Sequence, residues 1–142
     1  MTSDVQANSK RVSNHLRVLR ILRQSNGPLT AYQILNLLRK HGISGPTTVY
    51  RALDRLIESG QVHRIESLNA YVICSNPGHR SAAGFVICDR CGGVSEFFDA
   101  EVEARLRQLA EDLGFGIRAG NIEVRGKCGD CLALPRKAGA QL

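Results

Sequence analysis

Apolar side chains recur at helical spacing in three segments of the N-terminal half of the chain. The glycine and proline of residues 26–28 end the first predicted helix, and Thr30 suits the N-cap of the second, which ends at residues 41–42. Pro46 opens the third helix because proline is preorganised for the first helical position, and residues 59–60 close it. The predicted apolar faces are Val12, Leu16, Leu19 and Leu22, then Ile34, Leu35, Leu37 and Leu38, and lastly Val49, Leu53, Leu56 and Ile57.

A β-hairpin is predicted directly after the third helix. Residues 61–66 and 70–74 are short extended runs, and the three residues between them form a turn. Three helices followed by a hairpin are typical of a winged helix-turn-helix, so we expect residues 1–74 to form such a domain. Small residues dominate positions 75–84, which we interpret as a hinge or linker loop.

The C-terminal part of the chain has a different pattern, in which short strands and one helix alternate. Strands are predicted at residues 85–88 and 94–98, Asp99 suits the N-cap of a helix, and a further strand is predicted at residues 116–124. The apolar face of that helix is Val102, Leu106, Leu109 and Leu113. Residues 85–142 are thus expected to form a small α/β unit, and the whole chain to be α+β.

Two identical Cys-x-x-Cys pairs lie in this C-terminal part. Cys88 and Cys91 form the first pair, and Cys128 and Cys131 form the second. Four thiolates on two short hooks suit a tetrahedral metal ion with soft ligands, and zinc is the usual occupant. A site closed by four cysteines leaves no open position for water, so we expect zinc there to serve folding. The fifth cysteine, Cys74, is left over.

The charge balance of the chain indicates a class of binding partner. The chain of 142 residues has 19 Lys and Arg against 13 Asp and Glu, a net charge of +6, and basic chains of this size are commonly attracted to phosphate backbones. Residues 1–10 are polar and do not resemble a signal peptide, and no run approaches the roughly 20 apolar residues of a membrane span. We therefore expect a cytoplasmic protein with no membrane partner, in which thiols stay reduced and paired cysteines bind metal.

The exposed face of the third helix suits double-stranded DNA. In a helix-turn-helix the N-terminal part of the second helix lies in the major groove. Arg51 is long enough to reach N7 and O6 of a purine, while Tyr50 suits a thymine methyl group or a phosphate. The expected DNA-binding residues are Thr47, Thr48, Tyr50, Arg51 and Arg55 of the third helix and Tyr32 of the preceding one. The alternative is an ordinary solvated helix face.

Four further residues have metal-binding side chains, although none stands out alone. His63 and Cys74 belong to the predicted hairpin, His79 to the linker loop, and Glu96 to a predicted strand of the second unit. One sulfur, two nitrogen and one oxygen ligand make a tetrahedral zinc site, which would join the two units. The alternative is that the four are unrelated surface positions.

Six stretches of the sequence together match a known pattern. They are residues 31–32, 34–38, 48–53 (TVYRAL), 62–67 (VHRIES), 85–96 (FVICDRCGGVSE) and 128–131 (CGDC). On these residues the chain resembles the ferric uptake regulator family, and specifically its zinc uptake regulator branch, from about Arg17 to Leu132. The TVYRAL and ICDRCG segments are highly specific together.

The resemblance implies a homodimeric, zinc-responsive repressor that binds palindromic operator DNA and controls zinc uptake genes. In similar proteins four cysteines hold a structural zinc, and a hinge site of two histidines, a cysteine and a glutamate holds a regulatory one. The corresponding residues here are Cys88, Cys91, Cys128 and Cys131 for the first zinc and His63, Cys74, His79 and Glu96 for the second, which gives two zinc ions per subunit. The Tyr-Arg pair of the recognition helix corresponds to Tyr50 and Arg51.

Several alternatives stay open at this point. A regulator of the same fold that senses iron, nickel, manganese or peroxide is one, and a DNA-binding protein with only a structural zinc is another. Iron-sensing relatives carry a histidine run before the first hook, where this chain has only the histidine of residues 78–81 (GHRS). An enzyme is not expected, because the zinc-deaminase pattern H-x-E and P-C-x-x-C fails at His63 and at Ile87. No small-molecule substrate other than a metal ion is expected.

Overall fold

The computed structural model describes residues 13–75, 84–117 and 121–133. The chain divides into two compact units, Met1–Arg80 and Ser81–Leu142. The division falls within the loop predicted at residues 75–84, of which residues 76–83 lie outside the described ones. In the described segments, no helix has the length and apolar character to cross a membrane.

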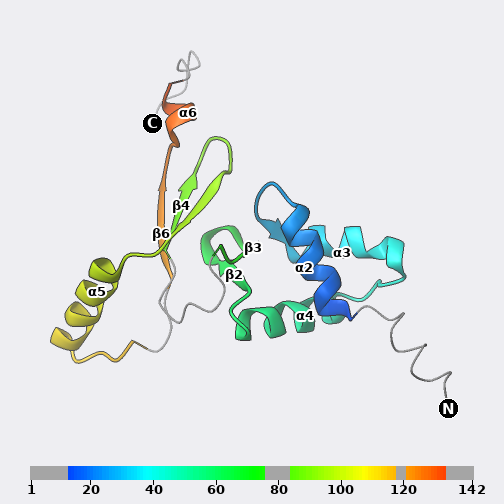
Figure 1. Ribbon diagram of the computed structural model, residues 1–142, viewed down its shortest axis with the longest axis horizontal. Coiled ribbons are helices and arrows are strands. Elements are labelled where there is room, and N and C mark those ends of the chain that lie inside the picture. The colour runs from blue at the N-terminus through cyan, green and yellow to red at the C-terminus, as the bar shows by residue number, and fades with distance from the viewer. Residues whose placement is uncertain (1–12, 76–83, 118–120, 134–142) are drawn as a thin grey trace. The chain divides into compact units, whose positions relative to one another are not determined.

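The structure describes three α-helices in the first unit (Figure 1). They are α2 Asn14–Gln24, α3 Ala31–Leu38 and α4 Pro46–Glu58. At the start of α3, Thr30 Oγ1 accepts a hydrogen bond from the Gln33 N–H at 3.2 Å, and Gln33 Oε1 accepts one from the Thr30 N–H at 2.9 Å. This reciprocal pair is a capping box, so the predicted cap is confirmed. A 3-10 turn, η1 Arg39–His41, follows α3 and ends at Gly42, whose φ is 80°.

The helices of the first unit pack around one aliphatic core. Its members are Val18, Leu19, Leu22, Ile34, Leu35, Leu38, Val49, Ala52, Leu53, Leu56, Val62 and Tyr71. Three predicted core positions are wrong, because Leu16, Leu37 and Ile57 are 49%, 45% and 37% exposed. At 100° per residue each lies about 90–115° from the centre of the buried stripe of its own helix. Val18 and Ala52, which the predicted faces omit, lie nearer to those centres and are buried.

The predicted hairpin is present and forms the wing. Strands β2 Val62–Ile65 and β3 Ala70–Ile73 pair antiparallel, with His63 opposite Val72. The turn between them contains Asn69 at φ 47°, a left-handed conformation that asparagine tolerates. A short strand that the sequence pattern did not predict, β1 Leu29–Thr30, pairs with the other edge of β3. The first unit is therefore a winged helix-turn-helix, as expected.

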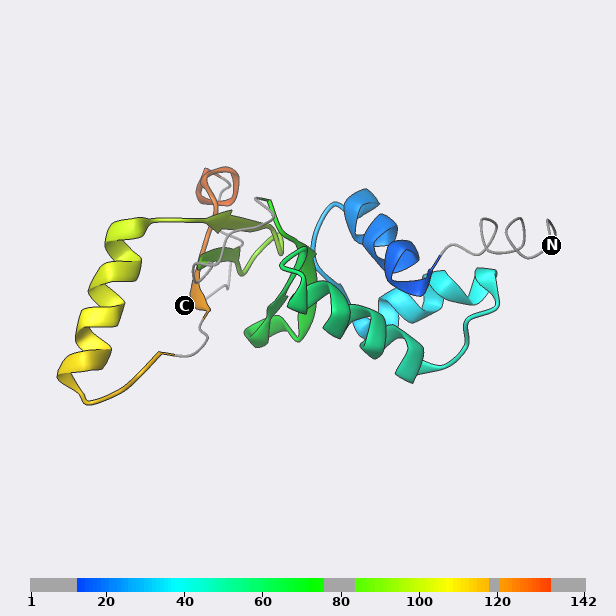
Figure 2. The same ribbon diagram turned by 60° about the horizontal axis from the view of Figure 1, so that its bottom comes forward.

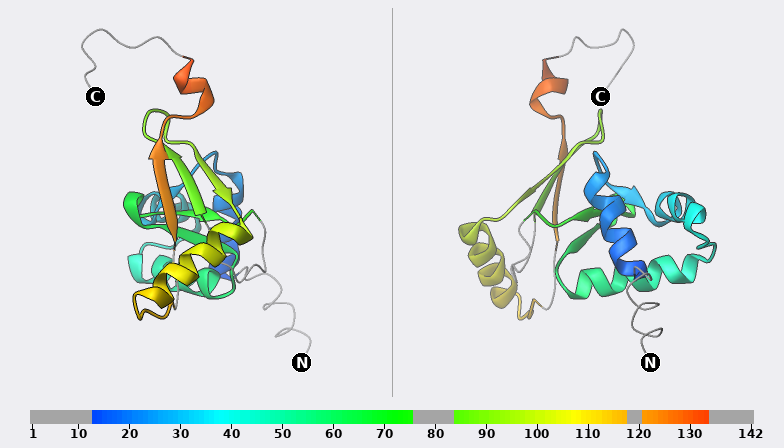
Figure 3. Two further views of the ribbon diagram at one scale, coloured as in Figure 1. Left: turned by 90° about the vertical axis from the view of Figure 1, so that its left-hand side faces the viewer. Right: turned by 45° about the vertical axis from the view of Figure 1, so that its right-hand side comes forward.

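A three-stranded sheet forms the centre of the second unit (Figure 3). Strand β4 Gly84–Cys88 lies in the middle and pairs antiparallel with β5 Val94–Phe97 and parallel with β6 Ile122–Gly126. The strand predicted within residues 116–124 is thus placed too early, since pairing with β4 begins at Ile122. Parallel partners need a crossover connection, and α5 supplies the helix of that crossover.

Two helices complete the second unit, whose mixed strands and helices confirm the α+β class. Asp99 Oδ1 accepts hydrogen bonds from two backbone N–H groups at 2.9 and 3.1 Å and so caps α5 Ala100–Asp112 as predicted. Figure 2 shows α5 standing clear of the sheet of its own unit, and no residue of α5 is buried. A short helix not predicted from the sequence, α6 Gly129–Leu132, follows β6.

One close approach lies at the start of the pairing between β4 and β5. Gly84 lies directly opposite Phe97 in the register of the two strands. A β-carbon added to Gly84 would lie 2.1, 2.4 and 2.6 Å from three ring carbons of Phe97. The phenylalanine ring therefore lies across the glycine, in space that any other residue would fill.

Candidate metal centre and nucleic-acid interface

The four cysteines of the two hooks meet at one end of the second unit's sheet. Cys88 is the last residue of β4, and Cys91 lies in the turn that follows. Cys128 directly precedes α6, which comes after β6, and Cys131 lies in α6. Parallel pairing explains why the two hooks meet, because the C-terminal ends of β4 and β6 lie at the same end of the sheet (Figure 3). Their four Sγ atoms all lie within 4.8 Å of one another.

The spacing of the sulfur atoms fits a zinc ion. Four sulfurs at about 2.3 Å from a central zinc, in tetrahedral arrangement, are about 3.8 Å apart. The Sγ atoms of Cys91 and Cys128 are 3.8 Å apart. Soft donors, tetrahedral spacing and two short hooks together make this donor set suitable for zinc.

Backbone amides prepare one of these sulfurs to be a thiolate. The N–H groups of Cys91 and Cys128 point at Cys88 Sγ, at 3.5 and 3.3 Å. These hydrogen bonds, that from Cys91 first, lower the pKa of Cys88 to about 6. In contrast, the side-chain hydrogen bond with Cys128, together with burial, raises the pKa of Cys131 to about 12. A metal ion must therefore displace protons from the cluster, and its binding weakens as the pH falls.

Contacts between the two hooks hold their backbones in register. The Asp89 N–H donates to the carbonyl of Gly126 at 2.8 Å, and the Asp89 carboxylate accepts from Arg125 Nε at 3.0 Å. Arg90 Nη1 reaches the carbonyl of Cys131 at 3.5 Å. Each contact joins the first hook to β6 or to the second hook, so the residues between and beside the cysteines orient them. The roles of Asp89, Arg90 and Arg125 were not predicted, because charged residues beside cysteines carry no signal of their own in the sequence.

The first unit brings together two of the other predicted metal ligands. His63 on β2 and Cys74, directly after β3, have ligand atoms within 4.8 Å of each other. The Cys74 N–H donates to the carbonyl of Gln61 at 2.8 Å, which extends the hairpin pairing to the cysteine. Glu96 lies on β5 of the second unit, and His79 lies outside the described residues.

The residues expected to contact DNA lie on the outer side of the helix-turn-helix. Thr47, Tyr50, Arg51 and Arg55 are exposed on α4, and Thr48 is half-buried. Tyr32 on α3 is 65% exposed, and the Arg39 guanidinium lies 6.0 Å from the centre of its ring. The winged helix thus presents hydroxyl, phenol and guanidinium groups on its surface.

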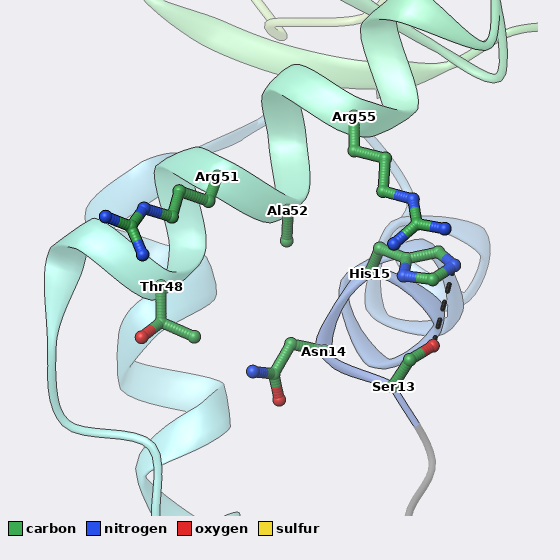
Figure 4. A pocket seen from close by; sticks show the side chains of 7 residues that line it. All are labelled: Ser13, Asn14, His15, Thr48, Arg51, Ala52 and Arg55. Carbon is green, nitrogen blue, oxygen red and sulfur yellow. Dashed lines mark hydrogen bonds between the residues drawn. The ribbon is translucent and has the colours of Figure 1, made fainter.

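A hollow of about 350 Å³ lies beside the exposed face of α4 (Figure 4). It is lined by Ser13, Asn14 and His15 at the start of α2 and by Thr48, Arg51, Ala52 and Arg55 of α4. Ser13, Asn14 and His15 were not predicted from the sequence as functional residues. Their signal is a polar cluster at a helix start, which becomes informative only when α2 is known to pack against α4.

Comparison with known proteins gives one consistent result. The sequence profile of the Ferric uptake regulator family matches residues 6–125. The zinc uptake regulation protein of Escherichia coli (strain K12) is 43% identical over 133 residues, which cover 91% of this chain and 77% of that protein.

Two solved structures have the same fold over nearly the whole chain. A zinc uptake regulator complexed with zinc and DNA has a TM-score of 0.81 at 40% identity, covering 90% of this chain and 87% of its own. Holo XcZur has a TM-score of 0.81 at 37% identity, covering 94% and 100%. The chain therefore belongs to the ferric uptake regulator family, a family of transcription regulators.

Proposed function

We propose that this chain is a zinc-responsive transcriptional repressor, which binds palindromic operator DNA as a homodimer and controls zinc uptake genes. The observation that carries the proposal is the placement of the His63 and Cys74 ligand atoms, which lie within 4.8 Å of each other on the wing hairpin of the winged helix-turn-helix. The likeness to a zinc uptake regulator complexed with zinc and DNA supports both the metal and the partner. We propose no enzymatic activity and no membrane partner for this protein, and we expect it to act in the cytoplasm.

The DNA-binding role falls to the first unit, residues 1–74. Arg51 reaches a purine in the major groove from the first turns of α4, and Tyr50 beside it contacts a thymine methyl or a phosphate. Thr47, Thr48, Arg55 and Tyr32 contact the sugar-phosphate backbone. All of these side chains except the half-buried Thr48 are exposed on one winged helix, which supports these roles.

The four-cysteine set holds a structural zinc. Zinc supplies a fixed tetrahedral centre when bound, and the Sγ atoms of Cys88, Cys91, Cys128 and Cys131 are its ligands. Because the hooks follow β4 and β6, the bound set closes a loop of the chain that contains all of α5. This site therefore contributes to folding and to the shape of the dimerisation unit, residues 85–142.

A second, regulatory zinc site makes DNA binding respond to the metal. His63 and Cys74 are its ligands from the first unit, His79 belongs to the linker loop of residues 75–84, and Glu96 is its ligand from the second unit. With one thiolate and two protonatable imidazoles, this set binds zinc more weakly than four thiolates, which suits sensing. The chain thus holds two zinc ions per subunit.

These ligands couple metal to DNA by ordering the hinge. The two recognition helices of a dimer must be about 34 Å apart to enter successive major grooves. A zinc ion bound by residues of both units would exclude arrangements of the recognition helices that do not match this spacing. A coupling typical of allosteric proteins, about 1–3 kcal/mol, corresponds to roughly 5–150-fold in DNA affinity.

The homodimer is formed by the second unit. Leucines, a valine and a phenylalanine remain exposed along and after α5, namely Val102, Leu106, Leu109, Leu113 and Phe115. An exposed apolar stripe on a helix that buries none of its residues within its chain supports a partner surface. A second copy of this chain is the partner that we propose.

A titration of DNA binding against buffered free zinc tests the proposed function. The wild-type protein is expected to bind two zinc ions per chain and to bind operator DNA only when the weaker site fills. Cys74→Ser and His79→Ala are expected to leave a folded dimer that holds one zinc and does not respond. DNA binding that is the same at all zinc concentrations would instead favour a DNA-binding protein with only a structural zinc. A response to iron, nickel, manganese or peroxide in the same assay would reassign the signal within the same fold.

A further inference from the structure

The hollow between α2 and α4 has the chemistry of an anion site. Two of its lining side chains are arginines, one is a histidine, and three carry hydroxyl or amide donors. None of its lining residues is acidic. Within the part of the chain that the structure describes, neither Arg51 nor Arg55 has an ion-pair partner. These permanent charges are therefore available to a ligand from outside.

The side chains converge from two helices that are far apart in sequence. Figure 4 shows Asn14 and Thr48 facing each other across the hollow, with Ala52 at its back and the Arg55 guanidinium beside the His15 ring. The small side chain of Ala52, one turn after Thr48, leaves the space open. His15 also lies 3.5 Å from the hydroxyl of Ser13, which shares in orienting its ring.

The position of the hollow selects one kind of anion. Arg51 and Arg55 belong to the helix that we propose to enter the major groove, and α2 lies to its side. In helix-turn-helix proteins the recognition helix lies in the major groove, between two sugar-phosphate strands. An element that packs against the side of this helix, as the start of α2 does, therefore faces one of those strands. A phosphate of that strand carries one negative charge and two free oxygens, which match several donors on two walls.

We propose that the hollow seats one backbone phosphate of the bound DNA, held between Asn14 and His15 of α2 and Arg55 of α4. This inference rests on the proposed function and adds α2 to the DNA interface. Because α2 and α4 both hold this phosphate, it fixes how deeply α4 enters the groove. Asn14 and His15 are thus positioning residues for the base contacts of Arg51.

The test uses a duplex that the zinc-loaded wild-type protein selects from random-sequence DNA. Each phosphate of one half-site is replaced in turn by an uncharged methylphosphonate, and the dissociation constant is measured for every duplex. In the wild type one linkage beside the groove is expected to cost about tenfold or more in affinity, as for a lost hydrogen bond to a charged group. In Asn14→Ala/His15→Ala that linkage is expected to lose most of its effect, while the other linkages keep theirs.

Controls separate a phosphate seat from general charge and from misfolding. Arg23→Ala removes a full charge from an exposed position at the other end of α2 and is expected to leave the linkage profile unchanged. His15→Arg, in a chain that keeps Asn14, is expected to show the wild-type effect of that linkage on DNA affinity. Circular dichroism and dimer size are measured for every variant. Identical linkage profiles in the wild type and Asn14→Ala/His15→Ala would overturn the inference. So would an equal loss in Arg23→Ala.

Three further outcomes distinguish other failures. If the DNA-free protein binds inorganic phosphate at submillimolar concentration and Asn14→Ala/His15→Ala does not, the hollow is a site for free anions and the DNA assignment is wrong. If the zinc-loaded protein selects no duplex, the proposed function fails and this inference falls with it. If a duplex is selected but no linkage depends on the α2 residues, only the hollow has been misassigned.

Discussion

Replacing Gly84 by alanine tests whether the pairing of β4 with β5 depends on the aromatic ring that crosses it. The new β-carbon would lie 2.1–2.6 Å from three ring carbons of Phe97, whereas carbon atoms in contact are about 3.5–4.0 Å apart. Either the ring or strand β5 must therefore move by more than about 1 Å. Overpacking of this kind costs about 1–3 kcal/mol.

The expected loss is measurable by heat denaturation. The second unit spans residues 81–142, and in a unit of this size 1 kcal/mol shifts Tm by about 4–8 °C. We expect Gly84→Ala to lower the Tm of the zinc-loaded protein by at least about 4 °C at a fixed protein concentration. A scanning calorimeter or circular dichroism at 222 nm records the transition.

Two companion variants isolate the cause. Gly126→Ala on the neighbouring strand β6 meets no atom within 4 Å, so it is expected to be neutral or stabilising by about 0.4–1 kcal/mol through the unfolded chain. In a Phe97→Ala background, Gly84→Ala is expected to cost little because the ring is gone. If Gly84→Ala is as stable as Gly126→Ala, or if Gly84→Ala loses the same stability with and without the Phe97 ring, the ring is not the cause of the loss.

Three other substitutions test the four-cysteine metal centre and the DNA interface. Cys88→Ser removes the sulfur on which two N–H groups converge, so the chain is expected to lose the structural zinc and the native circular dichroism spectrum; a folded dimer with full zinc content would contradict this. Asp89→Asn removes the charge from an exposed ion pair with Arg125 and is expected to speed zinc release to a chelator by about 1.5- to fivefold, so an unchanged rate would contradict it. Arg51→Ala is expected to relax base preference in a selection from random DNA, whereas an equal loss on all sequences would make Arg51 a phosphate contact.

Local signals in the sequence were reliable where one residue decides the outcome. Thr30 and Asp99 cap α3 and α5 as predicted, because a side-chain oxygen at that position satisfies backbone donors that are otherwise free. The two cysteine hooks also meet as predicted, since each hook is a local unit and β4 and β6 carry them to one edge.

Features that depend on the packing of distant segments were not predictable in the same way. Leu16 and Leu37 have apolar side chains at helical spacing, yet they are exposed because the neighbouring helices cover other faces. The parallel pairing of β6 with β4 and the hollow beside α4 likewise arise from which elements meet. A linear pattern specifies each element but not its neighbours.

The lack of buried residues on α5 has a consequence for how the chain behaves at low abundance. A helix of 13 residues is marginal in water by itself, and α5 gains no buried side chain from its own chain. If its stripe is covered only by a second copy, the order of this helix rises and falls with the number of copies in the cell. Dilution alone, with zinc and temperature held constant, would then begin to unfold the regulator, and a cell that makes too few copies would lose repression before it ran out of protein.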